Sequence, residues 1–132
     1  MIVVDTNVIA YLYLNSERSA QSEALLLKDA DWAAPLLWRS EFQNVLALYL
    51  HKNLLALEDA VQIMDEAIRL MRSGEYTVAP SQVLRLAAQS ACSAYDCEFV
   101  ALARDLRVPL VTVDRQILAQ FPDVAVLPDD YL

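Results

Sequence analysis

The chain has 132 residues, a length typical of one domain and sufficient for a core that needs neither disulfides nor a structural metal. Hydrophobic residues make up 57% of the sequence and Gly74 is its single glycine, which favours a helix-rich fold and excludes a disordered chain. The formal net charge of −8 argues against a broad electrostatic surface for nucleic acid.

The sequence gives little support for a membrane-spanning segment, a zinc site or a catalytic histidine. No apolar run reaches the ~18 residues needed to cross a bilayer, and the N-terminus lacks the basic segment of a secretory signal. We therefore expect a cytoplasmic protein with no membrane association. Cys92 and Cys97 lack further Cys or His neighbours, so two buried thiols in a reducing compartment are preferred over a zinc site. His51, the single histidine, has no nucleophile pattern beside it.

The first half of the chain predicts strands alternating with helices. The wholly apolar run Ile2–Val4 is typical of a strand buried on both faces. The next predicted elements are a helix over Ser19–Lys28, a short strand at residues 32–34, a long helix over residues 36–52 with Pro35 in its first turn, and a helix over residues 57–74 that Gly74 ends.

The second half continues the alternation. Its predicted elements are a strand at residues 76–78, a helix from Pro80 through residue 87, a helix over residues 93–107, an apolar strand at residues 110–113, a short helix over residues 115–121 and a small strand at residues 124–126. Such alternation predicts an α/β fold, with a parallel sheet covered by helices on both faces. We expect residues 1–132 to form a single domain.

Two acidic residues follow apolar strands directly. Asp5 comes after the first strand and Asp114 after the strand at residues 110–113. In a parallel α/β sheet, both positions lie at the carboxyl edge, where the ligands of open sheets bind. Asp is also a favoured N-cap residue, and capping is the stronger interpretation for either residue taken alone.

Two further acids lie near helix starts. Glu41 shares a helical stripe with apolar Leu37 and Val45, where a carboxylate is costly unless it is paired or binds a cation. The alternative interpretation is that Glu41 lies just beside the apolar stripe, where its carboxylate reaches solvent or pairs with Arg39. Asp96 stands three residues after Ser93, as in a capping box, and capping is again the stronger interpretation for this residue alone.

The four acids together favour a metal site. If they converge, carboxylates about 5 Å apart repel by ~3 kcal/mol at an effective dielectric near 20. The two lysines, Lys28 and Lys52, lie elsewhere in the sequence. Mg²⁺ or Mn²⁺ would compensate the charge because both prefer carboxylate oxygens and water. A carboxylate–metal cluster without a catalytic His, Cys or Ser indicates water activation and stabilisation of phosphoryl oxygens.

The motifs that carry these acids resemble those of PIN-domain nucleases, in particular the small single-domain kind found as VapC-type toxins. The matching stretches are VVDTNVIA at residues 3–10, SEFQNVL at residues 40–46, and SAYDCEFVALARDLRVPLVTVDRQIL at residues 93–118. The resemblance spans the chain, although residues 15–35 and 50–90 are generic helix. It implies a three-layer PIN-like fold, with a twisted parallel sheet of about four to five short strands flanked by helices.

The resemblance also implies roles for individual residues. Asp5, Glu41, Asp96 and Asp114 match the acidic quartet that binds metal and carries catalysis. The implied supporting residues are Thr6 and Asn7 beside the first acid and Thr112 before the last. Arg39 and Arg115 each neighbour an acid in sequence and are candidate contacts to the RNA backbone, with exposed solubilising charge as the alternative. Some relatives carry another acid or amide just beyond the last Asp. The nearest candidate here is Gln116, which puts a full second metal site in doubt.

The implied activity is hydrolysis of RNA phosphodiester bonds with Mg²⁺ or Mn²⁺. The implied assembly is a homodimer inhibited by a cognate antitoxin, as in type II toxin–antitoxin pairs. A non-toxin RNA-processing nuclease and a catalytically silent PIN-fold binding module stay open as alternatives. A haloacid-dehalogenase-like phosphatase would need a second Asp where this chain has Asn7, and a phospho-receiver domain would need an acidic pair near Asp5.

Overall fold

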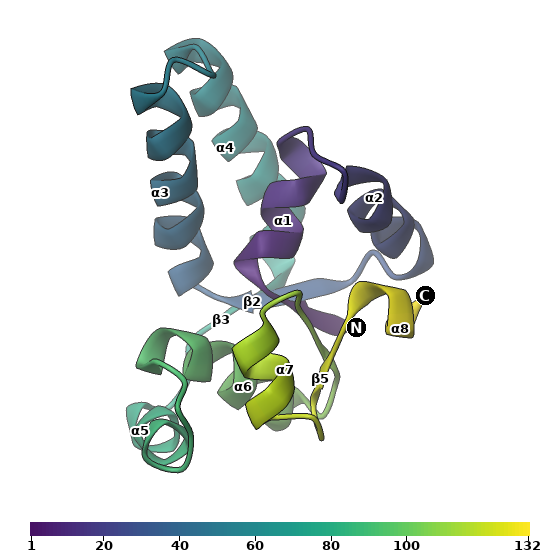
Figure 1. Ribbon diagram of the computed structural model, residues 1–132, viewed down its shortest axis with the longest axis vertical. Helices are drawn as coiled ribbons and strands as arrows, with labels where there is room; N and C mark the ends of the chain where they lie inside the picture. The colour runs from purple at the N-terminus through teal and green to yellow at the C-terminus, as the bar shows by residue number, and fades with distance from the viewer.

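A central parallel sheet organises the computed structural model, which describes residues 1–132 (Figure 1). Its strand order is β3-β2-β1-β4-β5, and every pairing is parallel. The strands are β1 (Ile2–Val4), β2 (Trp32–Pro35), β3 (Glu75–Tyr76), β4 (Leu110–Val111) and β5 (Ala125–Val126). The α/β fold predicted from the alternation of strands and helices is confirmed.

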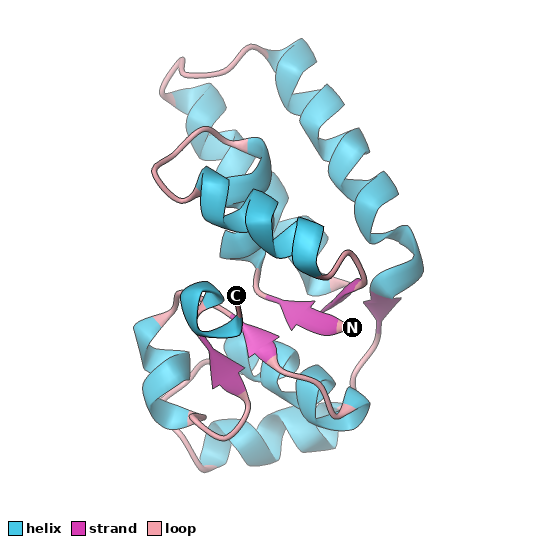
Figure 2. Ribbon diagram, turned by 90° about the vertical axis from the view of Figure 1, so that its right-hand side faces the viewer, coloured by secondary structure: helices cyan, strands magenta, loops and turns pink.

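Helices cover both faces of this sheet, as Figure 2 shows. The helices on one side are α1 (Thr6–Tyr13), α2 (Ser19–Lys28), α3 (Leu37–His51) and α4 (Leu57–Met71). Those on the other side are α5 (Pro80–Ala88), α6 (Ala94–Leu106) and α7 (Arg115–Gln120). A final turn, α8 (Pro128–Tyr131), contacts α2. Parallel strands must be joined by crossover connections, which here are helices, and these connections are right-handed. The direction of strand addition reverses after β3, so the helices that follow β3 cover the second face of the sheet.

The hydrophobic core lies on both faces of the central strands. All three residues of β1 and both residues of β4 are fully buried, because helices cover both faces of the sheet and α6 contacts both strands. Among the largest buried side chains are Trp38, Phe42 and Phe99. A rigid pair of central strands therefore fixes the two loops that follow β1 and β4.

The start of α3 differs from the prediction. Pro35 is the last residue of β2 and pairs with Tyr76, and the helix begins at Leu37. The residues that α3 buries are Trp38, Phe42 and Leu46. Glu41 precedes Phe42 and is partly exposed, so it lies beside the buried stripe rather than on it. Glu41 therefore lies off the buried stripe, as the alternative had it, but its side chain accepts from Thr6 Oγ1, and Arg39 pairs with Glu75 instead.

Other boundaries shift by a few residues. The strand expected at residues 76–78 is β3 at Glu75–Tyr76, where it pairs with the end of β2. The strand expected at residues 110–113 ends at Val111, and α8 was not predicted because four residues show no helical periodicity. The helices include none with the length and apolar character that crossing a membrane requires.

Candidate active site

The four predicted acids line one pocket at the carboxyl edge of the sheet. The lining residues of this pocket, which has a volume of about 340 Å³, are Asp5, Thr6, Asn7, Glu41, Asn44, Val45, Asp96 and Asp114. β1 and β4 are neighbours in the sheet, and the chain leaves them toward opposite faces, through α1 and α7. This is a topological switch point, where the strand ends diverge and leave room for a ligand. We call this pocket the acidic pocket.

Asp5 is the most buried of the four carboxylates. It is the N-cap of α1, and its Oδ1 accepts from the backbone N–H of Thr6 at 2.8 Å. Its Oδ2 accepts from Thr112 Oγ1 at 2.6 Å and from Asn7 Nδ2 at 3.3 Å. Burial raises the pKa of Asp5 from an ordinary 3.8 to about 6, against the lowering effect of the hydrogen bonds from Thr112 and Thr6. Asp5 therefore caps α1 and lines the acidic pocket at the same time.

Glu41 enters the acidic pocket from the second turn of α3. Thr6 Oγ1 donates to Glu41 Oε1 at 2.7 Å, which ties the start of α1 to α3. Burial raises the pKa of Glu41, and the charges of Asp96 and Glu98 raise it further. The predicted supporting positions Thr6, Asn7 and Thr112 thus each contact one of the pocket's carboxylates.

Asp96 and Asp114 enter the acidic pocket from the starts of two helices. Asp96 is in the first turn of α6, where its backbone N–H donates to Ser93 Oγ at 3.1 Å. Asp114 caps α7, and its Oδ1 accepts from the Ile117 N–H at 3.0 Å. Burial and the charge of Asp114 raise the pKa of Asp96. The capping interpretation is correct for Asp114, whereas the side-chain cap of α6 is Ser93, and both acid side chains line the pocket.

Protein cations leave the acidic pocket uncompensated. The chain's three ion pairs join other residues, and none includes one of the pocket acids. Arg39 Nε and Nη2 bind the two oxygens of Glu75 at 2.6 and 2.7 Å, so this guanidinium is engaged away from the pocket. Arg115 is exposed beside Asp114 and forms no ion pair.

Residues 2–125 match the PIN domain family. The chain belongs to the PIN domain family. It is 29% identical over 124 residues to Ribonuclease VapC3 of Pyrobaculum aerophilum, a match that covers 92% of this chain and 95% of that protein.

Solved structures share the fold. FitAcB from Neisseria gonorrhoeae superposes with a TM-score of 0.76 at 19% identity over 100% of both chains. A toxin–antitoxin complex from Klebsiella pneumoniae contains a chain with a TM-score of 0.72 at 17% identity, covering 97% of this PIN domain and 98% of that chain.

The donor set of the PIN domain's acidic pocket suits a hard divalent cation. It consists of carboxylate and amide oxygens with no sulfur or imidazole, the set that Mg²⁺ and Mn²⁺ prefer. Asn7 Oδ1, on a residue that lines the pocket, is buried and has no hydrogen-bond partner. As they stand, no three Asp, Glu, His or Cys side chains converge closely enough to hold one ion together. Carboxylates that repel one another are expected to stay apart until a cation draws them in.

Asn44 is a pocket residue that sequence reasoning missed. It lies three residues after Glu41 on α3, and residues at that spacing are neighbours on a helix surface. The spacing alone could have added this amide to the predicted site.

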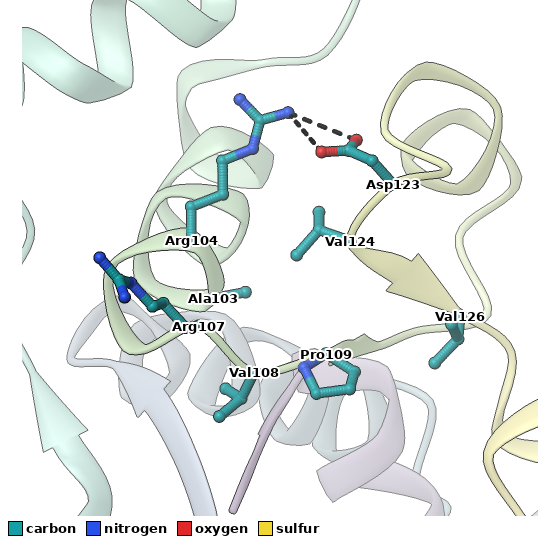
Figure 3. Close-up of a pocket in the computed structure, with 8 residues that line it drawn as sticks. All are labelled: Ala103, Arg104, Arg107, Val108, Pro109, Asp123, Val124 and Val126. Atoms are coloured by element: carbon teal, nitrogen blue, oxygen red, sulfur yellow. Dashed lines mark hydrogen bonds and ion pairs between the residues drawn. The ribbon is translucent and has the colours of Figure 1, made fainter.

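A larger hollow of about 370 Å³ lies at the opposite edge of the sheet (Figure 3). Pro109 and Val124, which line it, precede β4 and β5, so it opens at the amino ends of these strands. Its single acid, Asp123, is paired with Arg104 at 3.0 Å. The hollow therefore lacks a group of free carboxylates, and the smaller acidic pocket is the better candidate active site.

Proposed function

We propose that this PIN domain is a Mg²⁺- or Mn²⁺-dependent endoribonuclease, the toxin component of a type II toxin–antitoxin pair. One observation carries the proposal: four carboxylates from four separated stretches of chain line one pocket with no protein cation among them. The 29% identity to a protein named as a ribonuclease supports RNA as the substrate. A single buried cluster of 31 hydrophobic residues spans both ends of the chain and supports residues 1–132 as one domain.

Asp5, Glu41, Asp96 and Asp114 would hold the ion. A bound divalent ion supplies a Lewis acid that activates water and neutralises charge developing on the scissile phosphate. Without such neutralisation, the carboxylates repel a phosphodiester, so we expect the metal-free pocket to bind RNA weakly.

The surrounding side chains orient the carboxylates. The Thr112 hydroxyl donates to Asp5 Oδ2, and the Thr6 N–H donates to Asp5 Oδ1. Because both oxygens are held, the plane of the carboxylate cannot rotate freely. Thr6 Oγ1 holds Glu41 Oε1 and leaves Oε2 without a protein donor. Positions fixed in this way reduce the reorganisation needed when substrate binds. We propose that Arg115, exposed at the start of α7, contacts the RNA backbone.

We also propose an antitoxin partner that covers the pocket. An apolar hollow of about 230 Å³ shares Asn7 and Val45 with the acidic pocket and is lined further by Ala10, Tyr11, Leu14, Ser16 and Tyr49. It suits a segment with apolar side chains, and the net charge of −8 suits a basic one. The similarity in fold to a chain of the Klebsiella toxin–antitoxin complex supports such a partner.

Assembly and compartment complete the proposal. We propose a homodimer, because Leu54, Leu57 and Val61 at the turn between α3 and α4 are more than half exposed and apolar. The two free thiols, both buried, agree with a reducing cytoplasm.

A ribonuclease assay on structured RNAs tests the proposed activity. Wild-type protein is compared with Asp5→Ala and Asp96→Asn, each with Mn²⁺ and with EDTA, and Asp65→Asn on the exposed face of α4 is the matched control. We expect cleavage by wild type and Asp65→Asn in Mn²⁺ only, and a loss of about 100-fold or more in both pocket variants.

Equal cleavage by all four proteins would indicate a contaminating nuclease or a different site. No cleavage by wild type with either metal on any RNA would favour the silent binding module.

A further inference from the structure

A second hollow adjoins the acidic pocket along the same edge of the sheet. It has a volume of about 290 Å³, and its lining residues are Val78, Pro80, Val83, Leu84 and Glu98. Val78 and Pro80 follow β3, whose neighbour in the sheet is β2, and β2 leads directly into α3 and Glu41. The hollow therefore lies beside the Glu41 end of the acidic pocket. We call it the flanking hollow.

The two sites share one helix. Asp96 of the acidic pocket and Glu98 of the flanking hollow are two residues apart on α6, a rise of about 3 Å along the helix axis. A polymer whose phosphate lies at the acidic pocket thus has a neighbouring nucleotide within reach of the flanking hollow.

The walls of the flanking hollow suit a flat, largely apolar ligand. Val78, Pro80, Val83 and Leu84 line it, and the Leu84 side chain is 64% exposed, an unusual position for leucine unless something covers it. Tyr95 is 62% exposed and precedes Glu98 by three residues on α6. Residues at that spacing are neighbours on a helix surface, so Tyr95, which does not itself line the hollow, lies next to Glu98 on α6.

One polar group faces this apolar surface. Glu98 lines the flanking hollow, is partly buried, and belongs to none of the chain's ion pairs or side-chain hydrogen bonds. Its two oxygens are free to accept hydrogen bonds from a ligand. A bidentate carboxylate pairs best with two parallel N–H donors on one planar edge.

We propose that the flanking hollow binds an unpaired guanine of the RNA substrate and that Glu98 reads its Watson–Crick edge. Among the four bases, guanine alone presents two adjacent donors there, N1–H and the N2 amine, while its faces pack on Leu84 and Tyr95. Sequence-specific RNA readers act in this way on unstacked bases in loops, with aromatic stacking and edge hydrogen bonds. The proposal rests on the proposed ribonuclease function and adds a base preference to it.

Nucleoside titration followed by NMR tests the subsite without requiring cleavage. Guanosine, inosine, adenosine, cytidine and uridine are each added to wild type, to Glu98→Gln, and to Glu58→Gln, an exposed control on α4. We expect guanosine to shift the amide signals of residues 78, 84 and 98 saturably. Its affinity should fall by about tenfold in Glu98→Gln, whose amide replaces one acceptor with a donor, and be unchanged in Glu58→Gln. Inosine, which lacks the N2 amine, should bind about tenfold more weakly than guanosine to wild type.

Equal binding of all nucleosides, no saturable binding at these residues, or an unchanged guanosine affinity in Glu98→Gln would overturn the proposal. Saturable shifts at the same residues with a basic apolar peptide, and none with guanosine, would assign the flanking hollow to a protein partner instead.

Cleavage mapping separates this proposal from the function on which it rests. With an active wild type, cuts should fall at a fixed spacing from an unpaired guanine, and replacing that guanine by inosine should reduce cutting there. Cleavage without any guanine preference would contradict the guanine subsite and support the ribonuclease function. Guanosine binding by a protein that cuts no RNA would support the subsite and contradict the ribonuclease function.

Discussion

Thr112 Oγ1 donates a hydrogen bond of 2.6 Å to Asp5 Oδ2 across 107 positions of sequence. The same oxygen accepts from the backbone N–H of Asp114 at 3.0 Å. One fully buried hydroxyl therefore joins the loop after β1 to the loop after β4 and sets the spacing of two of the four pocket acids. The pocket depends on this link because neither Asp has a protein cation to hold it.

Replacing Thr112 by Val, which has nearly the same shape, should damage the pocket more than the fold. The change removes a donor to Asp5 and leaves the Asp114 N–H unpaired, so we expect a loss of about 1–3 kcal/mol in the free energy of unfolding. The pKa of Asp5 should rise further, since the Thr112 hydrogen bond lowers it. Urea unfolding and Mn²⁺ affinity are the measurements. The exposed Thr77→Val is the control, and equal effects from both substitutions would contradict the role given to Thr112.

The metal-free protein should lose stability as the pH rises from about 4 to about 6. The pKa of Asp5 is 3.8 ordinarily and about 6 in the fold, so the folded state binds more protons than the unfolded state in this window. Stability therefore falls with rising pH by about 2–3 kcal/mol for this group. Burial raises the pKa values of Glu41 and Asp96 as well, which adds in the same direction.

Asp5→Asn should flatten that profile and stabilise the metal-free protein near pH 8. Asn is as good an N-cap as Asp, so the cap of α1 is kept while the buried charge is removed. Asp31→Asn, at an exposed position before β2, is the control. The experiment is urea unfolding in EDTA at several pH values. A wild type whose stability rises from pH 4 to pH 6 would show that Asp5 does not carry an uncompensated charge.

Gly74→Ala should destabilise the sheet at the amino ends of β2 and β3. A Cβ at this position would lie 1.9 Å from the backbone oxygen of Trp32 in β2, a group that cannot move without disturbing the strand. We expect a loss of about 3 kcal/mol or more in thermal unfolding experiments. The neighbouring exposed Ser73→Ala should change stability little, and similar melting temperatures for the two variants would contradict this packing.

Arg39 and Arg115 should differ in their effect on RNA binding. Arg39 forms a bidentate pair with Glu75, whose side chain is 9% exposed and also accepts from Trp38 Nε1 at 2.9 Å. Arg39→Ala should therefore lower stability by about 1 kcal/mol, discounted for the partly exposed guanidinium. It should leave the salt dependence of RNA affinity unchanged, whereas Arg115→Ala should reduce the slope of log affinity against log salt by about 1. Fluorescence anisotropy measures both slopes, and the reverse ranking would assign the RNA contact to Arg39.

Much of the architecture was predictable from local pattern. The apolar run Ile2–Val4 is continuous because helices cover both faces of β1, and the acids after β1 and β4 follow from strand polarity. Their place in one pocket depends on the strand order, which the residues alone do not specify. The resemblance to PIN domains implied that the four acids act together, without the order of the strands.

Other features depend on tertiary contacts. The buried face of α3 was misplaced by one residue, because Leu37, Val45 and Leu48 make several stripes of this helix apolar and periodicity cannot rank them. The pairing of Arg39 with Glu75 joins residues 36 positions apart and follows only from the β2–β3 register. The roles of the four acids stay a prediction that mutation must test.

Isothermal calorimetry of Mn²⁺ binding tests the central claim most directly, since binding needs neither RNA nor an antitoxin. Wild type, Asp96→Asn and the surface control Asp65→Asn are titrated at pH 7.5. We predict saturable binding by wild type and Asp65→Asn, weakened by about tenfold or more in Asp96→Asn. Absence of saturable binding in wild type, or equal binding by all three proteins, would contradict the claim that these carboxylates form a metal site.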